Sequence, residues 1–241
     1  MKTAIVTGAS RGIGAATAKL LAAKGYAVAV NYKNSHTDAE KVLEEITQKG
    51  GQGMLVKADV AVEADVIKMF SAVNQKLGNI TVLINNAAVN PTCSVEETQY
   101  QMLVNVFHTN VFGAFIASRE AVRFMRDAGG GAIVNISSEA ARFGGNRMAH
   151  YAASKAAINT FTVGFAREVA PYNIRVNAVS PGIIDTEAHA DATPERMSAI
   201  KSSLPMGRMG KPEEVAETIA WLLSDAASYV SGSVFSVTGA R

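Results

Sequence analysis

Short apolar runs alternate with longer amphipathic segments along the chain, and this alternation restricts the fold more than any other feature. The apolar runs are rich in Val and Ile and predict buried strands at 3–7, 27–32, 53–58, 82–85, 131–136, 175–179 and 233–237. The amphipathic segments predict helices at 14–24, 38–49, 62–77, 97–126, 151–170 and 213–224. We therefore expect an α/β fold, a doubly wound parallel sheet of about seven strands with helices on both faces.

Residues at the ends of the segments support the predicted helices. Thr37 and Glu40 have the spacing of a capping box at the start of the second helix. Gly25 and Gly50 stand where the first two helices should stop. Pro212 suits the first position of the last helix, because it needs no hydrogen-bond partner there.

No Pro- or Ser-rich linker, internal repeat or low-complexity tract interrupts the pattern, which favours a single domain over residues 1–241. Residues 185–209 are the weakly patterned stretch, rich in small and polar side chains. Irregular segments of this kind often cover active sites, so we expect this one to cover a substrate.

Composition excludes several classes of protein. The chain is 48% hydrophobic with a net charge of +2, and its charges are interspersed, so we expect no disorder and no nucleic-acid or membrane partner. One cysteine excludes a disulfide framework, and the four histidines lack metal-ligand spacing, so no metal is expected. The first residues lack the apolar core of a signal peptide, and no run approaches the ~20 apolar residues of a membrane span. These features together predict a cytoplasmic protein.

A glycine-rich turn follows the first predicted strand and opens the first predicted helix. Its free N–H groups and the positive end of the helix would face a pyrophosphate, and glycine lets the backbone approach closely. The spacing is G-x-x-x-G-x-G rather than the commoner G-x-G-x-x-G. We expect a dinucleotide cofactor to be bound by Gly8, Ser10, Arg11, Gly12, Ile13 and Gly14.

The end of the second predicted strand bears on which dinucleotide binds. In NAD-binding proteins an acidic residue there usually accepts hydrogen bonds from the ribose hydroxyls. This strand ends in Asn31-Tyr32-Lys33, without a carboxylate. Lys33 together with Arg11 would instead neutralise a 2′-phosphate. We expect Asn31 and Lys33 to contact the cofactor, and we favour NADP(H), with NAD(H) as the alternative.

Tyr151 and Lys155 lie four residues apart at the start of a predicted helix, so their side chains share one face. The helix follows the fifth predicted strand, and its start should lie near the carboxyl edge of the sheet, where ligands bind. An ammonium about 5 Å from a phenol stabilises the phenolate by about 3 kcal/mol. The pair thus predicts a tyrosine of lowered pKa that exchanges a proton with a substrate oxygen. The spacing alone also fits a buried tyrosine beside a surface lysine.

Several motifs occur together in one order: Thr7-Gly8-Ala9-Ser10-Arg11-Gly12-Ile13-Gly14, Asp59-Val60, Asn85-Asn86-Ala87-Ala88, Asn110, Ser137-Ser138, Tyr151 with Lys155, and Pro181-Gly182. With these motifs the chain resembles a short-chain dehydrogenase/reductase from end to end. Within that family it is similar both to glucose or polyol dehydrogenases and to 3-oxoacyl-[acyl-carrier-protein] reductases. The resemblance implies a Rossmann fold.

The resemblance also implies catalytic roles. Ser138 matches the serine that hydrogen-bonds the substrate oxygen, and Tyr151 matches the general acid/base. Lys155 matches the lysine that holds the nicotinamide ribose and lowers the tyrosine pKa. Asn110 matches the asparagine that anchors a proton-relay water.

Further cofactor contacts follow from the resemblance alone: Asp59 would face the adenine amino group. The other implied cofactor residues are Val60, Asn86, Ala87, Ala88, Tyr151, Lys155, Pro181, Gly182, Ile184 and Thr186. The chain departs from the family at Ala88, where glycine is usual, and an added methyl in a packed site typically costs ~1–3 kcal/mol.

The sequence as a whole predicts an NADP(H)-preferring oxidoreductase that interconverts a carbonyl and a secondary alcohol by hydride transfer. A sugar, polyol or other small carbonyl is slightly favoured over a 3-oxoacyl thioester, since basic residues for an acidic carrier protein are few. The arginines available for that purpose are Arg123, Arg126 and Arg147.

Other functions fit less well. A catalytically silent NADP(H)-binding sensor on the same fold is the alternative, but it would be expected to lose Ser138, Tyr151 or Lys155. An S-adenosylmethionine methyltransferase has no use for the Tyr–Lys pair. An epimerase would need a further substrate domain. The family pairs its two long helices across a dimer axis, so a homotetramer is expected.

Overall fold

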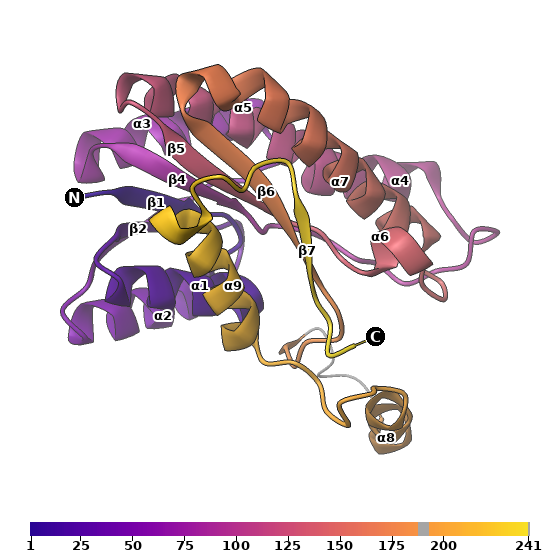
Figure 1. The fold of residues 1–241 in the computed structure, drawn as a ribbon. Helices are drawn as coiled ribbons and strands as arrows, with labels where there is room; N and C mark the ends of the chain where they lie inside the picture. Colours follow the sequence, from indigo (N-terminus) through magenta and orange to yellow (C-terminus); the bar gives the residue numbers. More distant parts are fainter. Residues whose placement is uncertain (188–192, 241) are drawn as a thin grey trace.

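The computed structural model of the chain describes residues 1–187 and 193–240 (Figure 1). Over these residues it contains one sheet of seven parallel strands in the order β3-β2-β1-β4-β5-β6-β7. The strands are β1 Thr3–Val6, β2 Ala27–Tyr32, β3 Gln52–Lys57, β4 Ile80–Asn85, β5 Gly131–Ile136, β6 Ile174–Pro181 and β7 Val234–Val237. The predicted doubly wound parallel sheet is confirmed.

Helices cover both faces of the sheet. In Figure 1, α1, α2 and α9 lie on one face, α3, α5 and α7 lie on the other, and α8 stands apart near the C-terminus. The helices are α1 Gly12–Ala23, α2 His36–Gln48, α3 Glu63–Leu77, α4 Tyr100–Phe107, α5 Gly113–Asp127, α6 Ala140–Phe143, α7 Ala149–Val169, α8 Pro194–Ser202 and α9 Pro212–Leu223. Shorter turns are the π-helical His108–Phe112 and the 3₁₀ segments Ala170–Tyr172 and Asp225–Ala227.

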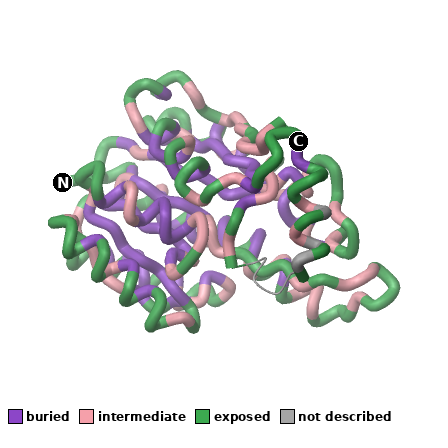
Figure 2. The backbone as a smooth tube through the Cα atoms, turned by 90° about the horizontal axis from the view of Figure 1, so that it is seen from below, coloured by how far each residue is buried: buried purple, intermediate pink, exposed green. Residues whose placement is uncertain are grey.

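The core follows from the apolar runs of the central strands. Ile5 of β1 lies beside Ala29 of β2 and Leu83 of β4, and all three are fully buried. Figure 2 shows buried residues running along the sheet and the inner sides of the helices. The edge strands β3 and β7 are only partly buried, because each has a neighbour on one side only. Two apolar layers, one on each face, thus hold the sheet.

The observed ends of the helices agree only in part with the ends predicted from the sequence. Gly25 and Gly50 follow α1 and α2 with positive φ of 87° and 79°, as expected of helix stops. The capping box of Thr37 and Glu40 is wrong, because α2 begins at His36 and Ser35 at its cap makes no side-chain cap bond. The helix starts two residues earlier than expected, and the ring of His36 in its first turn packs 5.2 Å from that of Tyr32.

The single helix expected over 97–126 is also wrong. It begins only at Tyr100 and is divided into α4 and α5 by the π-helical turn His108–Phe112. A π turn contains one extra residue, so the side chains on either side change face. Periodicity in the sequence does not reveal this insertion.

The strand order reverses between β1 and β4, and this positions the site. Because β2 lies on one side of β1 and β4 on the other, the two following connections leave in opposite directions and open a crevice at the carboxyl edge. Among the residues described, no helix has the length and apolar character needed to cross a bilayer. Nor do three or more metal-ligating side chains gather within that part of the chain.

Candidate active site

The glycines of the turn between β1 and α1 are required by close packing. A Cβ on Gly14 would lie 2.5 Å from both Asn86 Nδ2 and the Gly8 carbonyl oxygen. A Cβ on Gly8 would lie 2.9 Å from Ala87 Cα, and its φ is +61°. Gly12 also has a positive φ, and a Cβ there would point at the Thr186 methyl, 3.3 Å away. The turn is therefore a backbone cradle between the end of β4 and the segment after β6, and this shape fits a diphosphate.

Thr7 and Asn86 hold the cradle to β4. Thr7 Oγ1 donates to the Ile84 carbonyl and accepts the N–H groups of Asn86 at 2.9 Å and Ala87 at 3.0 Å. Asn86 Nδ2 donates to the carbonyls of Thr7 and Gly8. The Asn86 side chain thus shapes the turn, while Ala87 borders it and Ala88 is exposed.

Asn31 has a similar role from the β2 side. Its side chain is buried, its Oδ1 accepts the Gly8 N–H at 3.1 Å, and its Nδ2 donates to the carbonyls of Val56 and Ala58. Each of its polar atoms already has a protein partner. Asn31 therefore positions the turn from beneath it.

The two cofactor residues expected at the adenosine end meet each other. Lys33 Nζ lies 2.6 Å from Asp59 Oδ2, and the lysine side chain is 59% exposed. Asp59 Oδ1 also accepts the Ala61 N–H, which fixes the carboxylate. Arg11 is exposed at the start of α1. Val60 is buried against Gly113, where an added Cβ would contact it at 3.0 Å.

The segment after β6 closes the other side of the cradle. Gly182 packs against the Thr238 backbone, and Ile184 forms a bridge with Gly210, whose N–H donates to the Ile183 carbonyl. This bridge ties together the two ends of the expected substrate-covering segment 185–209. Residues 188–192 of that segment lie outside the described residues.

Ser138, Tyr151 and Lys155 come together at the carboxyl end of β5. The Ser138 hydroxyl hydrogen-bonds the Tyr151 phenol, and the Lys155 ammonium lies 5.7 Å from the Tyr151 ring centre. Lys155 is buried and its Nζ donates to the Ile136 carbonyl at 2.6 Å. The loop after β5 and the first turns of α7 position the three side chains.

Burial dominates the electrostatics of these groups. It raises the pKa of the Tyr151 phenol, and the hydrogen bond from Ser138 lowers that pKa by less. Burial lowers the pKa of the Lys155 ammonium to about 8. The lowered Tyr151 pKa expected from the neighbouring lysine is therefore wrong for this structure, since burial raises the phenol pKa by more than the Ser138 hydrogen bond lowers it.

Asn110 lies in the π-helical turn and faces the loop after β4. Its Oδ1 accepts the Val89 N–H at 2.8 Å, and its Nδ2 donates to the Val89 carbonyl and to Ser154 Oγ, each at 3.0 Å. It thereby joins α7 to the loop that begins at Ala87. A small hollow beside it is lined by Lys155, Asn110 and, from beneath, by Thr7, Asn85 and Asn135.

Sequence reasoning did not single out Asn135 or Thr162 as parts of this site. Asn135 Oδ1 accepts a hydrogen bond from Asn85 Nδ2 at 2.8 Å, and Asn135 Nδ2 donates to Thr162 Oγ1 at 2.9 Å. All three side chains are buried. Asparagine within two otherwise apolar strands was the available signal, because a buried amide needs polar partners.

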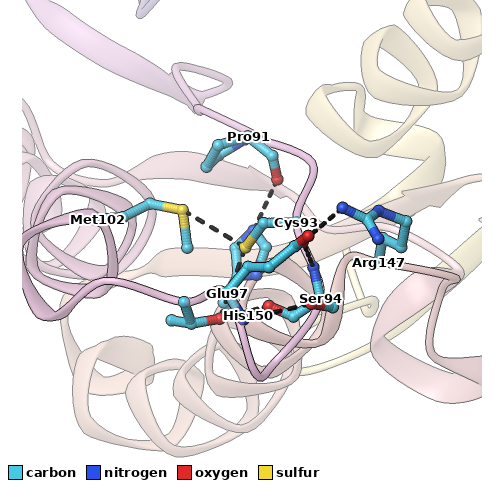
Figure 3. Close-up of polar contacts among 8 residues, drawn as sticks. Pro91, Cys93, Ser94, Glu97, Met102, Arg147 and His150 are labelled. Atoms are coloured by element: carbon cyan, nitrogen blue, oxygen red, sulfur yellow. Dashed lines mark hydrogen bonds and ion pairs between the residues drawn. The ribbon is translucent and has the colours of Figure 1, made fainter.

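Two loops form a wall at the start of α7 (Figure 3). The loop that follows β4 and the connection between α6 and α7 are joined where the Cys93 N–H donates to the Arg147 carbonyl at 3.0 Å. The loop after β4 also meets the first turn of α7, where His150 Nε2 lies 2.7 Å from the Pro91 carbonyl oxygen. Arg147 has a left-handed backbone, φ 58°, that these contacts sustain.

An ion pair between Glu97 and Arg147 crosses the same wall (Figure 3). Glu97 Oε2 also accepts the Ser94 N–H at 3.0 Å, and Ser94 Oγ accepts the Glu97 N–H at 3.2 Å. The Ser94 hydrogen bonds and then the Arg147 charge lower the pKa of the Glu97 carboxyl. Both charged side chains remain about half exposed, at 56% and 47%.

Comparisons with known proteins agree with this arrangement. A family described as enoyl-(acyl carrier protein) reductase matches residues 8–239. The chain is 48% identical over its full length to the full length of the uncharacterized oxidoreductase YgfF of Escherichia coli K12. It is 38% identical to a 3-oxoacyl-[acyl-carrier-protein] reductase of Synechocystis, over 99% of this chain and 96% of that one.

A solved structure extends the likeness to three dimensions. A double mutant of a Serratia marcescens short-chain dehydrogenase/reductase superposes with a TM-score of 0.93 at 39% identity, over 99% of this chain and 97% of the other. The sheet order, the backbone cradle and the relatives lead to one conclusion. This chain belongs to the short-chain dehydrogenase/reductase family of oxidoreductases, which use a nicotinamide dinucleotide.

Proposed function

We propose that the protein is an NADPH-preferring carbonyl reductase that also runs in reverse as a secondary-alcohol dehydrogenase. The observation that carries the proposal is the Ser138–Tyr151 hydrogen bond beside buried Lys155, at the sheet edge that also holds the glycine cradle. A nicotinamide dinucleotide, when bound, supplies or accepts the hydride. The cradle residues 8–14 and the segment from Pro181 to Thr186 would hold it.

The protein's own residues would handle the substrate oxygen. The Ser138 and Tyr151 hydroxyls bind the carbonyl oxygen, and Tyr151 Oη gives it a proton as the carbonyl becomes an alcohol. Burial keeps the phenol protonated at neutral pH, which suits the direction of reduction. Lys155 would hold the nicotinamide ribose through the donors that Ile136 does not use. Asn110 and the hollow beside Lys155 would order the water that returns the proton.

Tyr151→Phe tests the catalytic role. The substitution keeps the ring and removes the proton donor, so turnover should fall at least ~1000-fold, within the range ascribed to acid–base catalysis and oxyanion binding together. NADPH binding, followed by quenching of protein fluorescence, should change less than ~3-fold. Turnover equal to that of the natural chain would contradict the mechanism. Intact NADPH binding by a natural chain that reduces nothing would favour the sensor alternative.

NADPH preference is supported by the lack of a carboxylate at the end of β2 and by the exposed cations Lys33 and Arg11. In the protein alone Lys33 pairs with Asp59, and the 2′-phosphate would compete for it. Lys33→Ala should therefore raise the KM for NADPH by about 5–20-fold, since a charge-assisted hydrogen bond contributes about 1–2 kcal/mol in an exposed setting. The KM for NADH should change much less. Equal changes for both cofactors, in steady-state assays, would defeat the preference.

A small uncharged carbonyl is the proposed substrate. The arginines available to attract an acidic carrier protein are engaged: Arg123 with Glu120, Arg126 over the ring of Tyr172, and Arg147 with Glu97. Segment 185–209 is proposed to cover this substrate. A 3-oxoacyl thioester is the second candidate, because relatives 38% identical carry that name. NADPH oxidation with a panel of aldehydes, diketones, sugars and 3-oxo esters and thioesters decides between them.

A further inference from the structure

We propose that Glu97 is a specificity-determining residue that removes the attraction of Arg147 for negatively charged carbonyl compounds by cancelling its charge. The inference rests on the proposed function, since it concerns which carbonyl substrates reach Tyr151. Glu97 is not one of the reacting residues Ser138, Tyr151 and Lys155, and it lies on the wall drawn in Figure 3.

The position of Arg147 follows from the chain itself. It lies in the connection that leaves Ser138 through α6 and returns to Tyr151 at the start of α7, so this connection borders the reacting groups. Its backbone is held by the Cys93 N–H, and His150, three residues later, is held by the Pro91 carbonyl. A cation fixed at this point would attract anionic substrates toward the reacting groups.

Glu97 is built to meet that cation. The exchange of hydrogen bonds with Ser94 fixes the turn that carries the carboxylate, and the same carboxylate oxygen contacts Arg147 Nη2. The other exposed charges close by in the chain are Glu96 in the loop after β4 and Arg142 on α6, which are one of each sign. The exposed charges of the two loops and α6 therefore balance, and loss of either Glu97 or Arg147 leaves one net exposed charge among them.

An exposed ion pair contributes little to the free energy of unfolding. We therefore expect the Glu97–Arg147 pair to act through its charge balance, which affects the encounter with charged substrates. A charge at the rim of a binding surface alters the rate of encounter and makes it depend on salt. Glu97→Gln keeps an oxygen that can accept the Ser94 N–H, so the turn retains its hydrogen bonds while the charge is removed. Arg147→Gln leaves the opposite charge, and the double variant restores neutrality.

The experiment compares these four forms with two substrates that share one ketone, a short 3-oxo acid and its ethyl ester. The quantity measured is the ratio of kcat/KM for the acid to that for the ester. At low salt the ratio should rise about 2–5-fold in Glu97→Gln and fall by a similar factor in Arg147→Gln. It should return to the natural value in the double variant. These shifts should shrink at about 0.3 M salt.

Several results would overturn the proposal. One is an unchanged ratio in all four forms; another is a shift that persists at high salt. Equal losses for acid and ester would show that the pair only supports the loop. The dissociation constants of the acid and the ester are also measured with NADP⁺-loaded protein, and the ratio of these two constants is compared among the four forms. A natural chain that binds both compounds and reduces neither contradicts the proposed function, and the binding ratio still decides the role of Glu97.

Discussion

At the scale of single residues, the least stable arrangement in the site is the buried cation of Lys155. Its ammonium donates to the Ile136 carbonyl, and burial lowers its pKa from 10.5 to about 8. Between these two values the unfolded chain binds more protons than the folded one, so stability rises with pH in that window. Below about pH 8 the full cost of about 3 kcal/mol is present.

Lys155→Met should therefore stabilise the protein while it abolishes turnover. We expect a gain of about 1–3 kcal/mol at about pH 7, because the cost of the buried charge disappears and the Ile136 carbonyl loses its donor. The gain should shrink at about pH 9.5, where Lys155 of the natural protein is largely neutral when folded. Urea unfolding at both pH values measures it. Lys68→Met, an exposed lysine of α3, is the matched control and should show no such pH dependence.

At the scale of elements, the π-helical turn between α4 and α5 explains how Asn110 reaches the site. A regular helix from Tyr100 to Asp127 would lack the extra residue of the π turn and would rotate Asn110 by about 100° relative to α5. π turns recur at functional sites because they redirect a side chain in this way. Here the redirected amide connects the loop after β4 with Ser154 of α7.

Asn110→Ala should loosen that loop and reduce turnover. The Val89 N–H and carbonyl would lose their partners, and because Val89 is 41% exposed, water can replace them in part, so the expected cost is about 1 kcal/mol in unfolding free energy. We expect kcat to fall at least ~10-fold with a smaller change in the KM for NADPH. His108→Ala, exposed on the same turn, serves as the control and should retain activity. A fall in kcat that is equal in both variants would argue against a specific role for Asn110.

At the scale of the whole molecule, the π-helical turn and the helices α5 and α7 present an aromatic face to solvent. Phe112 and Phe115 are 49% and 46% exposed, and the Phe115 ring stacks 3.8 Å from that of Phe161. Apolar patches of this kind on a single chain often mark contacts with another subunit. We therefore propose that this face pairs copies of the chain within a homotetramer.

Light scattering should give a mass near four times the 25.3 kDa chain, about 101 kDa. Phe115→Lys should shift the mass toward that of a dimer or monomer, because a charge would be buried in the contact. Phe143→Lys changes a phenylalanine that is 65% exposed on α6 and should leave the mass unchanged. A natural chain of monomeric mass would contradict the assembly.

What the sequence determined by itself is local or repetitive. The alternation of apolar runs predicted the parallel sheet, and the four-residue spacing of Tyr151 and Lys155 predicted that they share a helical face; both can be inferred from local periodicity along the chain. Only the tertiary structure decided that Ser138 bonds Tyr151, that Lys33 pairs with Asp59, and that burial rather than charge controls the phenol pKa. These depend on which strands become adjacent and how deeply each group is buried, and no short window of sequence records either property.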